Sequence, residues 1–152
     1  MRRLATLLWL LAVLLAAPAT AAKLDEALAR LLDDSYGETA AAAGEIATSG
    51  DANASAILEA LADNRLQFSA AQKLVAITGK EGKLANAATG AVVTAPPADL
   101  APVRQNNRVR GAVQEALGAM TLLSPDPAKR LDAAQSIFKS QDATKLSQVE
   151  AA

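Results

Sequence analysis

The chain has 152 residues, a formal net charge of -1 and no cysteine or histidine. Without these residues it can form no disulfide, has no thiolate, and lacks the commonest general base and metal ligand, so we expect no enzyme, no metal and no cofactor. The balanced charge and the 3% aromatic content also argue against binding of nucleic acid.

The first residues have the pattern of a secretory signal peptide. A basic head, Met1-Arg2-Arg3, precedes an almost wholly apolar run from Leu4 to Ala17, and Ala19-Thr20-Ala21 is a small-x-small cleavage site. The alternative is a signal anchor that stays in the membrane, but the apolar run is shorter than the roughly 20 residues that span a bilayer. We therefore predict a signal peptide over residues 1–21 and an exported protein, placed in the periplasm or at the extracytoplasmic face of the bacterial inner membrane.

Residues 22–65 are predicted to form the first part of a helical repeat, with three helices. The first helix has apolar side chains three and four residues apart from Leu24 to Leu32. The second, mostly alanine, runs from about Glu38 to Thr48 and is stopped by Gly50. In the third, the apolar stripe consists of Ala54, Ile57, Leu58 and Leu61.

Residues 66–98 change in character and are predicted to be a short-strand insertion. The run from Leu74 to Thr78 is typical of a strand, and turns are expected at residues 79–82 and at Thr89-Gly90. We expect two to four short strands in a small β-hairpin element, with a flexible insertion as the alternative. Three prolines, at 96, 97 and 102, then indicate a linker.

Residues 99–152 are predicted to form the second part of the helical repeat. A long helix has an apolar stripe from Val109 to Met120, while Gly111 and Gly118 lie on its opposite side and are interpreted as seats for another helix. The helix is expected to stop at residues 124–127, Ser-Pro-Asp-Pro. A further helix then has a stripe made of Leu131, Ala134, Ile137 and Phe138.

The two helical parts align with each other without gaps. Residues 42–60 match residues 133–151 at eight positions, including a Ser-x-Asp-Ala turn between two helices. Chance matching of alanine-rich helices is the alternative. We interpret the match as repetition and predict a mainly α fold, in which HEAT-like helical hairpin repeats carry a small β-hairpin insertion.

A polar group at the start of the long helix is the candidate binding site. Arg104, Asn106, Asn107 and Arg108 form a donor-rich surface, and the two arginines share a helix face if the helix begins early. Helix capping and solvated charge are one interpretation. The other is a docking surface for another protein subunit, because arginine makes bidentate contacts well.

The same region carries a family resemblance. The run VRQNNRVR at 103–110, ALGA at 116–119 and LLSPDP at 122–127 resemble the start of the permease subunit of urea-type ABC transporters. The resemblance implies the extracytoplasmic N-terminal portion of such a permease, which is non-catalytic and supports assembly or docks the solute-binding subunit.

That family continues into a bundle of membrane spans, and this chain ends before any of them, so we expect it to be a fragment or a truncated product. The implied partners are the other transporter subunits and a periplasmic solute-binding protein, and the implied membrane association runs through the missing permease region. The alternative function is a free periplasmic HEAT-like repeat protein that binds a protein partner.

The first prediction concerns the signal peptide. We expect cleavage between Ala21 and Ala22, because small residues occupy the positions that signal peptidase reads. Mass spectrometry of the exported protein should give a mature chain that begins at Ala22, and an intact Met1 would contradict the prediction.

Overall fold

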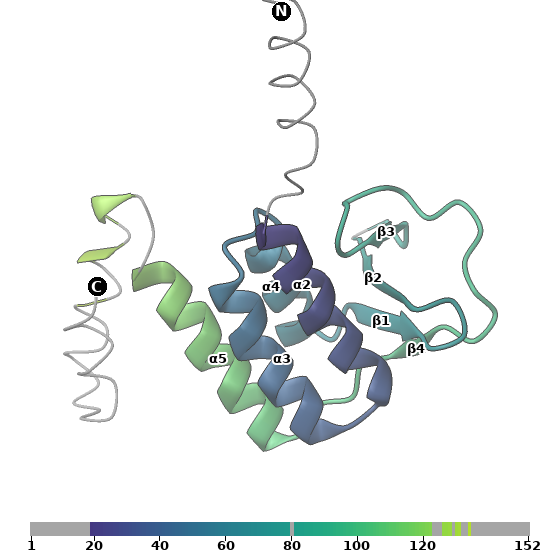
Figure 1. The fold of residues 1–152 in the computed structure, drawn as a ribbon, viewed down its shortest axis with the longest axis horizontal. Coiled ribbons are helices and arrows are strands. Elements are labelled where there is room, and N and C mark those ends of the chain that lie inside the picture. The colour runs from purple at the N-terminus through teal and green to yellow at the C-terminus, as the bar shows by residue number, and fades with distance from the viewer. Residues whose placement is uncertain (1–18, 80, 123–125, 129, 132–133, 135–152) are drawn as a thin grey trace, which may run out of the picture.

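The helices of the protein lie side by side and the strands form a separate sheet beside them (Figure 1). The computed structural model describes residues 19–79, 81–122, 126–128, 130–131 and 134. Within these residues, the helices are α2 (Ala19–Arg30), the 3-10 helix η1 (Leu31–Asp33), α3 (Tyr36–Thr48), α4 (Ala54–Ala62) and α5 (Asn107–Leu122). The strands are β1 (Leu66–Ser69), β2 (Leu74–Thr78), β3 (Leu84–Asn86) and β4 (Ala101–Pro102).

The helices between residues 22 and 65 follow the apolar periodicity of the sequence. The predicted stripe of the third helix, from Ala54 to Leu61, is wholly buried in α4. Gly50 follows α3 with a φ of 73°, a left-handed conformation that suits glycine and ends the helix. The three predicted helices are thus confirmed.

The sheet is antiparallel throughout and has the strand order β3-β2-β1-β4. One of its two inner strands, β1, pairs with strands on both sides, since Phe68 pairs with Val75 on β2 and with Ala101 on β4. Pro102 fits the edge position of β4, where no ladder hydrogen bond is needed from its nitrogen. At the other edge, Val93 N–H donates to Leu84 O at 2.9 Å and covers β3.

This sheet contradicts the predicted fold class. The chain was expected to be mainly α, with HEAT-like repeats and a small β-hairpin insertion, but the described residues form a mixed α/β fold with a four-stranded antiparallel sheet. The largest local difference lies at residues 101–102, where the prolines indicate a linker but the chain forms β4. In addition, α5 packs against α3 and α4.

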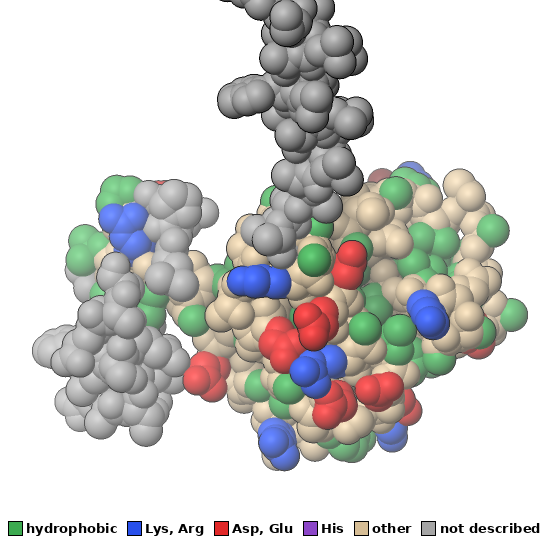
Figure 2. Space-filling model, viewed as in Figure 1, with side chains coloured by type: hydrophobic (Ala, Val, Ile, Leu, Met, Phe, Trp, Pro, Cys, Tyr) green, Lys and Arg blue, Asp and Glu red, His purple; other side chains and the backbone are tan. Residues whose placement is uncertain are grey.

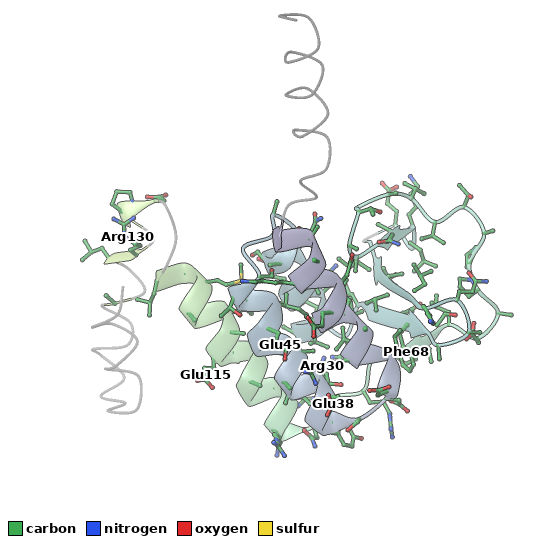
Figure 3. The ribbon with its side chains drawn as sticks, in the orientation of Figure 1. Arg30, Glu38, Glu45, Phe68, Glu115 and Arg130 are labelled. Atoms are coloured by element: carbon green, nitrogen blue, oxygen red, sulfur yellow. The ribbon has the colours of Figure 1, made fainter. Side chains whose placement is uncertain are left out.

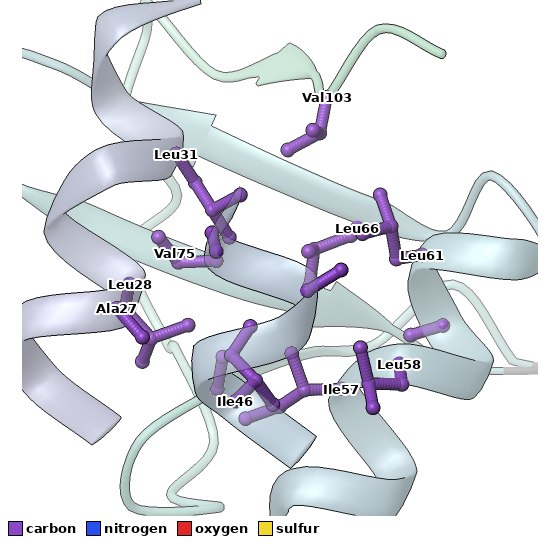
Figure 4. Packing of buried hydrophobic residues seen from close by; sticks show 14 of the residues in the cluster. Ala27, Leu28, Leu31, Ile46, Ile57, Leu58, Leu61, Leu66, Val75 and Val103 are labelled. Carbon is purple, nitrogen blue, oxygen red and sulfur yellow. The ribbon is translucent and has the colours of Figure 1, made fainter. Parts of the chain in front are cut away.

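The helices and the sheet share one hydrophobic core (Figure 4). Leu31 of η1 and Ile46 of α3 are fully buried, and they belong to the same cluster as Leu66 and Val75 of the sheet. Val103, directly after β4, is 4% exposed and joins the cluster as the chain turns toward α5. The segment after residue 66 is therefore part of the main core.

A buried serine fastens the long loop between β3 and β4 to the β1–β2 turn. Ser69, which is fully buried, donates its hydroxyl to Asp99 Oδ1 at 2.7 Å, and Asp99 Oδ2 accepts a hydrogen bond from Ala71 N–H at 3.1 Å. These two hydrogen bonds stabilise the carboxylate and lower the pKa of Asp99. These hydrogen bonds thereby hold the loop at its C-terminal end, just before β4.

The long helix differs from the predictions in two respects. It begins at Asn107, so it does not have the early start that would place Arg104 and Arg108 on one helix face. A Cβ placed on Gly111 or Gly118, the predicted seats of another helix, would meet no described atom within 4 Å. The part of the structure that is described thus offers no second helix seated on these glycines.

The remaining expectations fall mostly outside the described residues. Residues 1–18 of the predicted signal peptide, and nearly all of the second repeat copy, are among them. Leu131, from the predicted last stripe, is 58% exposed.

The second prediction uses the open surroundings of Gly111. Gly111→Ala should raise the free energy of unfolding by about 0.5–1 kcal/mol, because alanine restricts the unfolded chain and favours the helix without a clash. Urea denaturation measures the change. The matched control is Gly82→Ala, which also has open space around it but a φ of 74°, and it should destabilise the protein by about 1–2 kcal/mol. Equal effects of the two variants would contradict the prediction.

Candidate docking surface

Arg104 lies where β4 gives way to α5 and is held by residues from the η1–α3 junction. Its Nε donates to Asp34 Oδ1 at 2.8 Å, and its Nη2 donates to the backbone oxygen of Asp34 at 2.9 Å. The guanidinium carbon also lies 5.1 Å from the centre of the Tyr36 ring, which is within the range of a cation–π contact. Arg104 is thus fixed in place although its side chain is about half exposed.

The surroundings of Arg104 stabilise the charged form of its guanidinium. The hydrogen bond to Asp34, the negative charge of that carboxylate and the nearby Tyr36 all raise the pKa of the Arg104 guanidinium. Tyr36 is itself 38% exposed. An arginine stacked on an accessible tyrosine combines two of the residue types that most often dominate protein–protein interfaces.

Asn106 and Asn107 have different roles despite being neighbours. Asn106 Oδ1 accepts a hydrogen bond from Val109 N–H at 3.0 Å, so its side chain caps the start of α5. Asn107 is the first residue of the helix and is exposed. The capping interpretation therefore holds for one asparagine of the predicted site.

Arg108 is exposed, and no ion pair is found for it among the described residues. The condition for sharing a helix face with Arg104 is not met, because α5 begins three residues after Arg104. The structure therefore separates the four predicted residues. Arg104 and Asn106 hold the junction together, whereas Asn107 and Arg108 are exposed on the first turn of α5.

The partners of Arg104 at this junction could not be predicted from the sequence. Asp34 and Tyr36 lie about 70 residues before Arg104 in the chain, and no local pattern links them. The same holds for Gln105, whose amide Nε2 donates to Leu61 O and, at 3.0 Å, to Asn64 Oδ1. These contacts tie the start of α5 to the end of α4.

A second charged cluster lies across α2 and α3 (Figure 3). Arg30 donates to Glu38 at 2.8 Å and to Glu45 at 2.9 Å, and the two glutamates are seven residues apart on one face of α3. Both pairs raise the pKa of the Arg30 guanidinium, and the hydrogen bond to Glu38 is the largest single cause. Figure 2 shows that acidic side chains gather over this part of the surface.

The described residues contain no group of three or more His, Cys, Asp or Glu side chains that could hold a metal ion. The helices among them include none with the length and apolar character required to cross a membrane.

Comparison with known proteins identified no relative. No protein-family model, no curated protein and no solved structure matches the chain.

The third prediction separates the two asparagines. Asn106→Ala should lower the free energy of unfolding by about 1 kcal/mol, because the N–H of Val109 loses its capping acceptor. Asn107→Ala is the matched control and should change stability by less than about 0.5 kcal/mol. Thermal denaturation of both variants measures this, and a larger loss for Asn107→Ala would refute the assignment of the cap.

Proposed function

We propose that the chain is a non-catalytic docking domain, the extracytoplasmic N-terminal portion of a urea-type ABC transporter permease. In this role it contacts another protein, such as the solute-binding subunit. The contact surface is defined by Tyr36, Arg104, Asn107 and Arg108.

The observation that carries the proposal is the placement of Arg104. Two hydrogen bonds to Asp34 and the Tyr36 ring fix its side chain before any partner arrives. A partner therefore meets an ordered arginine and loses less side-chain entropy on binding. Binding to a preorganised Arg–Tyr pair is the chemistry expected of a protein interface.

Charge indicates the kind of partner. Asn107 and Arg108 lie in the first turn of α5, where the helix dipole adds positive potential to the charge of Arg108. This side of the junction suits carboxylate groups on a partner, which arginine can bind in a bidentate manner. The partner is accordingly a protein with an acidic contact surface.

The transporter role comes from the sequence. The pattern at residues 1–21 is that of an export signal, and residues 103–127 resemble the start of the urea-type permease. The residues that carry the resemblance include all of the polar positions at the β4–α5 junction. The stretch that carries the resemblance thus also supplies three of the four residues of the contact surface, Arg104, Asn107 and Arg108.

The fourth prediction tests docking by charge reversal. Arg108→Glu should weaken binding of the purified domain to the urea-binding subunit by roughly thirtyfold, a loss of about 2 kcal/mol that is typical of an interface hot spot. Biolayer interferometry measures the affinity. Arg110→Glu is the matched control, since Arg110 is also exposed but lies about 200° around the helix, and it should bind as the unaltered protein does.

Uptake of urea by cells that carry the altered gene gives a second measurement. Arg108→Glu should reduce uptake while immunoblots show a normal protein level. Normal uptake and unchanged affinity together would reject docking through this surface. A stop codon directly after Ala152 in the intact gene, with no urea-transport genes beside it, would reject the transporter role and leave a free exported binding protein.

A further inference from the structure

A cleft of about 400 Å³ separates α2 from the sheet, on other elements than the candidate docking surface. Its walls come from α2, from β2, and from the end of β3 with the loop that follows. Figure 2 shows hydrophobic side chains at the surface between α2 and the sheet. The volume lies within the usual range of about 300–1,000 Å³ for small-molecule sites.

The floor of the cleft is apolar. Leu28 and Val75 line it and are each 6% exposed, so their remaining accessible surface is directed to this space, and the half-buried Leu32 extends the same lining. Water held against such a floor is readily displaced by an aliphatic group. The floor thus favours a ligand with an apolar body.

The rim carries opposite charges on its two walls. Asp25 lies on α2 and Lys73 lies just before β2, and within the described residues no salt bridge or hydrogen bond is found for either side chain. They are therefore available to a ligand with an ammonium group and a carboxylate.

Two polar side chains on the sheet side add donors. Asn86 Oδ1 accepts hydrogen bonds from Ala88 N–H at 2.9 Å and Thr89 N–H at 3.1 Å, which leaves the amide NH₂ of Asn86 available as a donor. The Thr89 hydroxyl oxygen accepts from Ala91 N–H at 3.3 Å and keeps its own proton to donate. Together with Lys73, these groups suit a carboxylate at the sheet side.

The backbone of Lys73 is unusual. Its φ is 49°, a left-handed conformation that costs a residue with a Cβ about 1 kcal/mol or more and that glycine adopts freely. Lys73 closes the turn between β1 and β2, where its N–H donates to Ala70 O at 3.4 Å. A strained lysine at a position where glycine would be more stable is a reason to seek a function for its side chain.

We propose that this cleft binds a short aliphatic dipeptide with free termini. Its ammonium group pairs with Asp25, its carboxylate pairs with Lys73, and its side chains rest on Leu28, Leu32 and Val75. The volume of about 400 Å³ lies near the lower end of the range for small-molecule sites, which suits a ligand as small as a dipeptide.

Isothermal titration calorimetry of the purified chain with leucyl-leucine tests the proposal. Binding should weaken at least tenfold for N-acetyl-leucyl-leucine, which lacks the ammonium group, and for leucyl-leucinamide, which lacks the carboxylate. Diglycine should not bind, because it has no aliphatic side chain. Leucine that binds as tightly as leucyl-leucine would overturn the dipeptide assignment.

Substitution at Lys73 separates binding from folding. Lys73→Gly removes the ammonium group and also relaxes the left-handed backbone, so the variant should melt at the same or a higher temperature yet bind leucyl-leucine at least tenfold more weakly. Lys83→Ala, at an exposed lysine of the next turn, is the control and should bind normally. The Asp25→Asn variant should bind leucyl-leucine no more tightly than the unaltered chain binds N-acetyl-leucyl-leucine.

Two further results would overturn the proposal. One is the absence of binding by the unaltered chain at millimolar leucyl-leucine, and the other is equal affinity of the Lys73→Gly variant and the unaltered chain. Neither result bears on docking through Arg108, which is measured with a protein partner at a different surface.

Discussion

The packing of small side chains on α3 is the constraint on which the other helices depend. Ala42 and Ala43 are fully buried, and α2, α4 and α5 all pack against this helix. Because the distance between helix axes depends on the side chains at the contact, alanines allow the neighbours to approach closely. The same alanines bury little area, so the cohesion of the core comes from a few larger residues, among them Ile46.

The sheet completes this core. Leu66 of β1 and Val75 of β2 lie in the same cluster as Leu31 and Ile46, so the helices and the sheet bury each other's apolar faces. Short strands such as these have little stability alone. The contact with the helices also explains why β4 can consist of only two residues, since Val103 enters the core directly after it and donates its N–H to Leu66 O at 3.0 Å.

The features that were predicted correctly are those that local periodicity encodes. The stripe of α4 has apolar residues three and four apart, and β2 was predicted with the bounds that it has, Leu74 to Thr78. The strand β4 could not be predicted in this way, because two residues, one of them proline, have no period. Its strand conformation comes from pairing with Gln67 and Phe68, more than 30 residues earlier.

The candidate docking surface, too, could be predicted only as far as local sequence patterns reach. A donor-rich start of α5 was visible in the sequence, and so was the possibility that some of its residues act as caps. The sequence did not show which of these residues hold the junction together and which are exposed. That depends on where α5 begins and on the contact of Arg104 with Asp34 and Tyr36 across the fold. The dipeptide cleft was not predicted for a similar reason, since Asp25 and Lys73 are 48 residues apart in the chain and line one cleft only in the folded protein.

Because the four predicted residues have different roles, the docking surface is best studied one residue at a time. Replacing all four predicted residues at once would remove the cap of α5 and the link from Arg104 to Asp34 together with any contact to a partner. A loss of binding would then have two explanations, a weakened fold and a missing contact. Arg108 avoids this ambiguity, because it is exposed, lies outside the junction's hydrogen bonds, and shares its helix with a second exposed arginine that serves as its control.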